Sequence, residues 1–459
     1  MIHAAVAFGC GRRRPGAPRV GHHTAVPTAT PDAPRRARVG LWGLFDAGDL
    51  DGAAVRTVLD AELSRRLPGV ELVAASPLGR PTARDDGRTP RTLATLDAAA
   101  VDCIVVAGAL PLDGEALQAA YGDAFAGDAE ATLRLLLGGD VPRVAWHGVA
   151  LRGSPAGLAR VAHRPALLSV RDAASLAAVL QGDAAVQALP VPHDAILLSR
   201  VLHAGALRRR VETWRALGVL PPDGGVVLLD AAALHGRGGG SVRAAVGAVA
   251  AGSGHNVVVA GDGEGAATAA LPDAAGVWDV AAAVSVAAAV VSATPVLSAI
   301  AAGYGVPAVV LPGGSATGDA GLPGEIAAEG EEVAGALHRA LQSRAAPPRE
   351  ANAVLDSDLD RLAAWTGAAG ARAHPRRAPS PPSRDRLLLT RMRRALLGEV
   401  GELQARLAQA ESQHAAELAQ AREEARRWRD EAERVTTSKT WRYTEPARSA
   451  YRRLRHRTR

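Results

Sequence analysis

The feature that most constrains the fold is a regular alternation of short apolar runs with helical patterns between residues 38 and 365. Runs such as Asp102–Ala107 (DCIVVA) and Val226–Asp230 (VVLLD) carry no regular polar face. Strands of that kind are buried on both sides, as in parallel sheets covered by helices. The stretch between the apolar runs at residues 38–43 and 70–74 places Val55, Leu59 and Leu63 at helical spacing. The sequence therefore predicts an α/β fold with doubly wound parallel sheets.

The predicted elements fall into two groups. Strands over residues 38–43, 70–74, 102–107, 141–146, 166–170 and 186–189 form the first group, and a helix over 196–217 bridges to the second. The second group has strands over 226–230, 256–260, 288–291 and 308–311. Helices over 331–342 and 354–365 are expected to close it. We therefore predict an N-terminal Rossmann-like domain at residues 38–200 and a C-terminal one at 201–366.

The remaining segments have compositions of their own. Residues 1–37 are rich in Pro, Gly and Arg without periodicity, which predicts a disordered leader. A Pro-rich linker is expected over 367–383. Apolar residues spaced by three and four over 384–436 predict a coiled-coil helix with weak self-association, and a single solvated helix is the alternative. Residues 437–459 form a basic tail with aromatic side chains.

Charge and composition limit the partners. The net charge of +6 is concentrated near the two ends, which favours contact between residues 438–459 and an anionic membrane surface. A solvated tail is the alternative. Few aromatic residues interleave with basic ones elsewhere, which argues against nucleic acid. The two cysteines, Cys10 and Cys103, provide no disulfide or metal framework. We expect no cofactor and no metal, and a cytoplasmic protein, peripheral at the inner face of the membrane.

Four stretches carry a family resemblance, in the order VGLWGLFDAGDLDGAAVRTVLDAELSRRLPGVELVAASPLG (39–79), VPRVAWHGVAL (141–151), LSVRDAASLAAVL (168–180) and DVAAAVSVAAAVVSATPVLSAIAAGYGVPAVVL (279–311). Together they resemble the polysaccharide pyruvyl transferase family over about residues 38–345. The resemblance implies a GT-B-like arrangement with the active site between two domains. It also implies transfer of a pyruvyl group from phosphoenolpyruvate to a sugar of a cell-surface glycan or its precursor.

In the first domain the resemblance implies substrate-binding roles for Gly48, Asp49, Arg171 and Asp172. The Asp49 carboxylate would hold a sugar hydroxyl, and the alternative is a helix cap alone. The Arg171 guanidinium would grip a carboxylate or phosphate of the donor. The alternative for Arg171 is an internal ion pair that ties its strand to the following helix.

A glycine-rich loop in the second domain, HGRGGGS at residues 235–241, follows a predicted strand and precedes a helix. Its Arg237 and Ser241 would form an anion cradle at the helix N-terminus. The loop matches no phosphate-binding motif, and a connecting loop is the alternative.

Counting back from Tyr304 places Thr294–Leu297 on the family's Ser-Leu-His-Gly, so Val296 occupies the histidine position. Thr294 is still expected to bind substrate. His193 and His235 are the candidates to replace the lost acid or base, and a structural histidine is the alternative for each. The loss at Val296 favours a second hypothesis, a non-catalytic glycan-binding or scaffold protein. A GT-B glycosyltransferase is the third.

Overall fold

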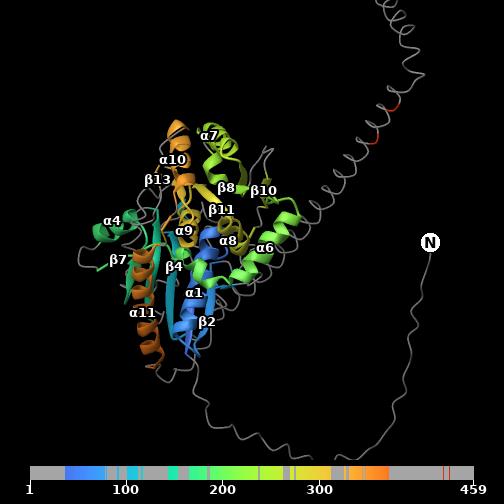
Figure 1. The fold of residues 1–459 in the computed structure, drawn as a ribbon. Coiled ribbons are helices and arrows are strands. Elements are labelled where there is room, and N and C mark those ends of the chain that lie inside the picture. The colour runs from blue at the N-terminus through green and yellow to red at the C-terminus, as the bar shows by residue number, and fades with distance from the viewer. Residues whose placement is uncertain are drawn as a thin grey trace, which may run out of the picture. The chain divides into compact units, whose positions relative to one another are not determined.

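The computed structural model describes two parallel sheets and the helices around them (Figure 1). The described residues are 37–77, 79, 90–92, 101–111, 115–116, 143–153, 165–182, 187–235, 238–261, 269–272, 275–311, 325–326, 330–343, 345–346, 348–371, 427 and 434. The chain divides into two units, Met1–His374 and Pro375–Arg459, and both sheets belong to the first.

The first sheet has seven parallel strands in the order β3-β2-β1-β4-β5-β6-β7. Their bounds are β1 (Arg38–Trp42), β2 (Glu71–Ser76), β3 (Arg91–Thr92), β4 (Cys103–Pro111), β5 (Val144–Arg152), β6 (Leu168–Val170) and β7 (Leu189–Pro190). The order reverses between β1 and β4, which are hydrogen-bonded neighbours. In open parallel sheets such a reversal opens a crevice beyond the carboxyl ends of the strands.

The second sheet has six parallel strands in the order β10-β9-β8-β11-β12-β13. Their bounds are β8 (Gly225–Asp230), β9 (His255–Ala260), β10 (Ala269–Leu271), β11 (Ala287–Ser292), β12 (Ala308–Val310) and β13 (Glu325–Ile326). Its reversal lies between β8 and β11. The two sheets thus repeat one topology, and the predicted fold class of two Rossmann-like domains in a GT-B-like arrangement is confirmed.

The helices follow the strands in chain order. They are α1 (Leu50–Arg66), α4 (Ala173–Gly182), α5 (Leu198–Val201), α6 (Ala204–Ala216), α7 (Gly239–Gly252), α8 (Val277–Ser285), α9 (Pro295–Tyr304), α10 (Gly330–Gln342) and α11 (Arg349–Ala371), with 3-10 turns η4 (Asp194–Leu197) and η5 (Ala231–Leu234). Helix α1 ends near Pro68 and Gly69, which cannot extend it favourably.

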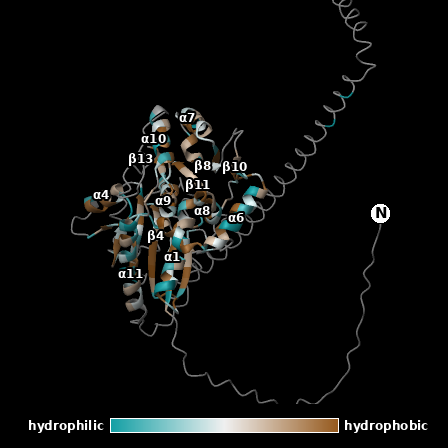
Figure 2. Cartoon of the chain, viewed as in Figure 1, coloured by the Kyte–Doolittle hydropathy of each residue, from teal (hydrophilic) through white to brown (hydrophobic). Residues whose placement is uncertain are grey.

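One apolar core joins the two sheets. Val39 and Leu41 of β1 belong to it, as do Val226 and Leu228 of β8, although the two strands lie in different sheets. Their neighbours in sequence point to the opposite faces and enter separate cores, because side chains alternate along a strand. Figure 2 shows the central strands as the apolar part of the fold, with polar residues on the outer helices.

Helix α11 differs from its prediction. It was expected to close the second domain, but it packs against α1, β4, β5 and η4 of the first sheet. It also runs to Ala371, past the predicted start of the linker at Gly367. Its apolar residues Leu355, Leu359 and Leu362 recur at helical spacing and are all buried there.

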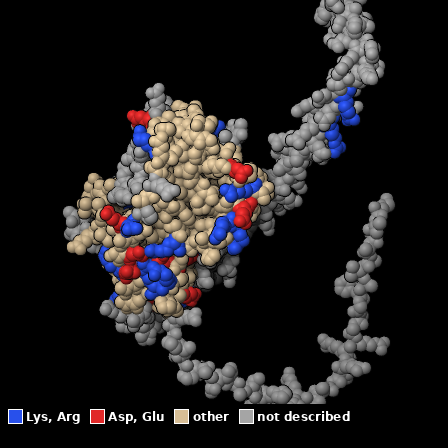
Figure 3. Space-filling view, viewed as in Figure 1, with Lys and Arg blue, Asp and Glu red and all other residues tan. Residues whose placement is uncertain are grey.

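A group of mixed charges holds α11 beside α1 and α5. Arg66 of α1 contacts Asp356 and Asp360, both at 2.7 Å, while Arg200 of α5 contacts Asp356 and Glu62, both at 2.9 Å. In the view of Figure 3, acidic and basic side chains lie intermixed over α1 and α11. The basic residues there are paired internally, so this surface is not a free anion-binding patch.

Other predictions need smaller corrections. The helix predicted over residues 196–217 is interrupted, because the chain is extended at Leu202 and His203. The turn η4 runs directly into α5 before this break, and α6 follows it. The His203 side chain accepts a hydrogen bond from the Gly205 N–H and so caps α6. The short strands β3, β10 and β13 and the helix α8 were not predicted. The predicted leader and the coiled coil with its basic tail lie outside the described residues, apart from Arg427 and Arg434.

Candidate functional site

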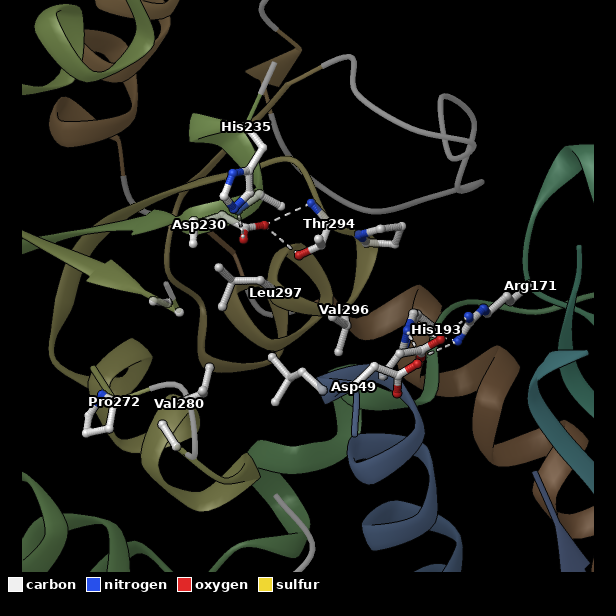
Figure 4. A pocket seen from close by; sticks show the side chains of 18 of the residues that line it. Asp49, Arg171, His193, Asp230, His235, Pro272, Val280, Thr294, Val296 and Leu297 are labelled. Carbon is white, nitrogen blue, oxygen red and sulfur yellow. Dashed lines mark hydrogen bonds and ion pairs between the residues drawn. The ribbon is translucent and has the colours of Figure 1, made fainter. Parts of the chain in front are cut away.

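A pocket of about 470 Å³ lies beyond the carboxyl ends of the strands of both sheets (Figure 4). Its volume is within the range of small-molecule sites. Its lining residues come from the first sheet (Asp49, Leu50, Asp51, Arg152, Arg171, His193) and from the second (Asp230, Ala231, Ala232, His235, Ala260, Gly261, Pro272, Ala275, Val280, Thr294, Pro295, Val296, Leu297). We call these two sets the first wall and the second wall.

The first wall contains a compact charged group formed by Arg171, Asp51 and His193. Arg171 follows β6, and its guanidinium pairs with the Asp51 carboxylate in the first turn of α1, with 2.6 Å between Nη1 and Oδ1. His193 follows β7, and its Nε2 lies 2.9 Å from the same Asp51 oxygen. Arg171 is therefore held in an internal ion pair, with Asp51 rather than with the neighbouring Asp172.

The hydrogen bonds of His193 define its tautomer. Its Nδ1 accepts from the Ala195 N–H at 3.1 Å, so the ring proton is on Nε2 and is donated to Asp51. The Arg171 Nη1, 3.0 Å from Nε2, directs its own hydrogen to the same carboxylate. Both ring nitrogens are engaged and the residue is only 1% exposed. His193 thus positions Asp51 and has no nitrogen available for proton transfer.

The Asp51 carboxylate stays ionised in this group. Burial alone would raise its pKa, but the Arg171 charge and the hydrogen bonds from His193 and Arg171 hold the pKa well below its usual range. Asp51 follows Asp49 and Leu50 at the start of α1, where the helix dipole also favours a negative charge.

Asp49 is the N-cap of α1, as one of the two sequence interpretations predicted. Its Oδ1 accepts from the Gly52 N–H at 2.7 Å, and its exposed side chain also lines the pocket. Gly48 precedes it with a φ of 80°, a left-handed conformation that favours glycine. Gly48 shapes the turn into α1 but is not a lining residue.

Arg152, at the end of β5, is a pocket cation that the sequence did not indicate. Its side chain is 28% exposed, and its Nη1 lies 3.6 Å from Asp172 Oδ2, beyond hydrogen-bond distance. Asp172 does not line the pocket, because its other oxygen caps α4 through the Ser175 N–H at 2.6 Å. Arg152 is therefore held less tightly than Arg171 and is the better placed of the two to meet an anion.

The second wall is organised by Asp230, at the end of β8. Its Oδ2 accepts from the Ser292 hydroxyl at 2.9 Å and from the Thr294 N–H and hydroxyl at 3.0 and 2.6 Å. Its Oδ1 accepts from the Ala232 N–H at 3.1 Å. Asp230 thus joins the ends of the central strands β8 and β11 and shapes the turn that begins α9.

The N-terminus of α9 faces the pocket without a side-chain cap. Thr294 is the N-cap residue, but its hydroxyl donates to Asp230 and does not accept from the first turn. Pro295, Val296 and Leu297 follow and line the pocket. Val296, at the family's histidine position, thus lies on the second wall across from Asp49 and His193 (Figure 4).

His235 follows η5 and lies at the second wall above Asp230 (Figure 4). Its side chain is exposed, and the described part of the chain provides no hydrogen-bond partner for its ring. Arg237 of the predicted anion cradle lies outside the described residues. Ser241 lies in α7, where its hydroxyl donates to the Gly238 carbonyl at 2.7 Å, and it does not line the pocket.

The structure thus brings Asp49, Arg171, His193, His235 and Thr294 together around one pocket, while Gly48, Asp172 and Ser241 lie outside its lining. Sequence reasoning missed Asp51, Arg152 and Asp230. For Arg152 and Asp230 the available signal was their position at the carboxyl end of a buried strand. Nothing in the sequence singled out Asp51.

The described residues contain no cluster of three or more His, Cys, Asp and Glu side chains arranged to hold a metal ion. They also contain no helix with the length and apolar character needed to cross a membrane.

No protein-family model matches the chain, and no curated protein matches it. Its fold is distantly similar to solved structures of enzymes. One is UDP-GlcNAc 2-epimerase from Neisseria meningitidis bound to UDP-GlcNAc (10% identity, TM-score 0.46, covering 73% of this chain and 100% of that one). Another is E. coli ADP-heptose LPS heptosyltransferase II (11% identity, TM-score 0.36, covering 70% and 99%). A third is the wall teichoic acid polymerase TagF (9% identity, TM-score 0.44, covering 73% and 89%). At such low sequence identities and TM-scores, the similarity does not show that this chain shares a substrate or a reaction with these enzymes.

Proposed function

We propose that the pocket binds phosphoenolpyruvate and that the chain transfers its pyruvyl group to a sugar of a cell-surface glycan or its precursor. The observation that supports this most is the placement of Arg152 and the uncapped N-terminus of α9 in one pocket. Both favour an anion, the first by charge and the second by its free N–H groups and helix dipole. Phosphoenolpyruvate carries two anionic groups, a carboxylate and a phosphate.

The reaction defines what else the pocket must supply. Two sugar hydroxyls add to C2 of the donor, the bond from C2 to the phosphate oxygen breaks, and C3 becomes a methyl group. Of the two hydroxyl protons, one ends on C3 and the other on the released phosphate. A group that moves a proton is therefore required. His235 fits this role best, because His193 has both ring nitrogens engaged.

The acceptor sugar is assigned to Asp49. Its side chain is exposed and lines the pocket, and a carboxylate can accept several hydrogen bonds, so a sugar hydroxyl can donate to it beside the Gly52 N–H. Asp51 is less suited, because Arg171 and His193 occupy its oxygens. In this proposal the Arg171 group keeps the first wall in place, and Arg152 and Asp49 make the contacts with substrates.

The experiment is calorimetric titration of phosphoenolpyruvate into the full chain. We expect saturable binding that Arg152→Gln weakens at least tenfold, about the free energy of one charge-assisted hydrogen bond. The matched control is Arg215→Gln, an exposed arginine on α6 outside the pocket. No binding by folded protein at millimolar donor would overturn the proposal. Equal affinity of the Arg152→Gln variant would overturn the assignment of that residue.

A second candidate function is glycan binding without catalysis. The apolar side chains of Val296 and Leu297 favour it, since they provide no proton donor where the family has histidine. Release of inorganic phosphate from phosphoenolpyruvate in the presence of envelope glycan separates the two functions. Transfer predicts release that His235→Ala abolishes while donor binding persists. Binding alone predicts no release from either protein.

A further inference from the structure

A second group of charges lies inside the first sheet domain, away from the pocket lining. The His147 side chain projects from β5 and contacts two carboxylates, with 2.9 Å from Nε2 to Asp194 Oδ1 and 2.9 Å from Nδ1 to Asp358 Oδ2. Ser169 of β6 donates to the same Asp358 oxygen at 2.6 Å. All four residues are at most 5% exposed. We call them the buried cluster.

The geometry requires a positive charge at His147. Both of its ring nitrogens face carboxylate oxygens, and a carboxylate that is ionised can only accept. Burial alone would lower the pKa of His147, but the Asp194 charge and hydrogen bonds to both aspartates raise it to about 10. Asp194 Oδ2 has no hydrogen-bond partner within the described residues, so His147 is the partner that compensates this carboxylate.

The backbone around His147 is built for this contact. The pairing of β5 with its neighbours shifts register next to His147, between Ala107 and Ala109 of β4 and between Trp146 and Val149. Gly148 adopts a φ of 55°, and a Cβ there would lie 3.1 Å from Asp194 Oδ2. The bulge thus needs glycine, both for its conformation and for the approach of η4.

Through Asp194 the cluster reaches the first wall. Asp194 is the first residue of η4, and His193 is the N-cap of the same turn. His193 lies beside Arg171 at the pocket (Figure 4), and its Nε2 contacts Asp51 at 2.9 Å and Arg171 at 3.0 Å. One short turn therefore carries a side chain of the buried cluster and a side chain of the first wall on consecutive residues.

Through Ile196 the same turn reaches the second wall. Gly303 of α9 packs so closely on η4 that a Cβ there would lie 2.2 Å from the Ile196 carbonyl oxygen. The other end of α9 carries Pro295, Val296 and Leu297, which line the pocket. A shift of η4 would therefore move a helix of the second domain as well as His193.

We infer that His147, Asp194 and Asp358 form a positioning cluster that sets the pocket walls relative to each other by holding η4. The expected change in phosphoenolpyruvate affinity rests on the proposed function, but the expected change in the NMR signal of His193 does not. Because Asp358 belongs to α11, the inference also gives this helix a part in shaping a pocket that it does not line.

The test compares two substitutions on one helix. Asp358→Asn removes a carboxylate of the buried cluster. Asp356→Asn removes a carboxylate two residues away whose ion-pair partners among the described residues are Arg66 and Arg200. The full chain is labelled with ¹⁵N-histidine, and the Nε2–H signal of His193 is identified by its loss in His193→Gln. Ser169→Ala is a milder variant, since it removes the hydroxyl that donates to Asp358 and accepts from the Gly148 N–H but leaves all three charges.

We expect Asp358→Asn to shift or broaden the His193 signal, Ser169→Ala to change it less, and Asp356→Asn to leave it in place. Phosphoenolpyruvate affinity should fall about tenfold in Asp358→Asn alone, in the range of couplings between separate sites. An unchanged His193 signal in folded Asp358→Asn would overturn the inference, as would an equal change in Asp356→Asn. If the unmodified chain does not bind phosphoenolpyruvate, the proposed function fails, and the His193 signal still decides the inference.

Discussion

The two sheets bury carboxylates in different ways. In the first, Asp194 and Asp358 face the His147 cation. In the second, Asp230 is 7% exposed and pairs with no basic side chain of the described residues, since hydroxyls and backbone N–H groups surround it instead. The first arrangement depends on a proton that can be removed, and the second on dipoles that do not titrate in the ordinary pH range.

This difference indicates how the stability of each domain responds to substitutions. A cation between two buried carboxylates is costly to remove, because Asp194 loses its compensating charge and Asp358 is left with the more exposed Arg361, 3.4 Å away. A carboxylate held by several neutral donors loses its partners one at a time, each at a smaller cost. We therefore expect the stability of the first domain to be sensitive to single substitutions and to pH. The stability of the second domain should fall in steps as donors to Asp230 are removed one at a time.

The largest expected effect is that of His147→Gln. The variant leaves two buried carboxylates beside a neutral amide, and we expect a loss of about 3–5 kcal/mol in the free energy of unfolding. Urea titration followed by circular dichroism measures it. His338→Gln, at an exposed histidine of α10, is the control and should change the free energy by less than about 0.5 kcal/mol. Similar values for the two variants would remove the contrast between the sheets.

The pH dependence should follow the same residue. The pKa of His147 is raised from 6.5 to about 10 on folding, so its contribution is fully present below pH 6.5 and is lost as the pH rises through 10. The difference in unfolding free energy between the unmodified chain and His147→Gln should therefore shrink across that window. Urea titrations at pH 6, 8 and 10 measure it, and a constant difference would contradict the cationic state.

Asp230→Ala comes next. It leaves the hydroxyls of Ser292 and Thr294 and nearby backbone N–H groups without their acceptor, and we expect a loss of about 2–3 kcal/mol. The control is Asp223→Ala, in an exposed turn before β8. A loss no larger than that of the control would show that the α9 turn is stable without the carboxylate.

The smallest effect is expected for Thr294→Val, which keeps the backbone N–H bond to Asp230 but removes the hydroxyl bond. We expect a loss of about 1 kcal/mol in unfolding free energy. Thr213→Val is the matched control, because its hydroxyl bonds the Arg209 carbonyl on the exposed face of α6. If Thr294→Val equals Asp230→Ala in effect, the donors around Asp230 act as one unit and not in steps.

Much of the fold was predictable because its strands are apolar on both faces. β1 and β8 lie close to their predicted ranges, and β4 begins one residue late and runs on to Pro111. Helix α1 contains Val55, Leu59 and Leu63, the residues predicted at helical spacing. The strands β3, β10 and β13 have two or three residues each, too few for a period to emerge. Helix α8 was missed because its Ala- and Val-rich sequence runs into β11 with Ser285 as the single polar residue between Asp279 and Ser292.

The site was predictable only where local sequence decides position. Asp49 caps α1 by accepting from the N–H of Gly52, three residues later, so its role followed from neighbouring residues. The pairing of Arg171 with Asp51 spans 120 positions, and that of His147 with Asp358 spans 211. Such partners are determined by the order of the strands and by the return of α11 to the first sheet. No local sequence pattern predicts the strand order or the packing of α11 on the first sheet.

The packing of α11 against the first sheet also determines the order in which contacts form while the chain is being translated. A ribosome completes all the strands of the first sheet well before it makes Asp358, so the nascent domain holds His147 and Asp194 without their third partner. Contacts of such long sequence separation form late and slow folding. Until α11 is made, the apolar surface that Leu355, Leu359 and Leu362 cover in the finished protein has no cover, and exposed surface of this kind makes an incomplete domain prone to aggregation.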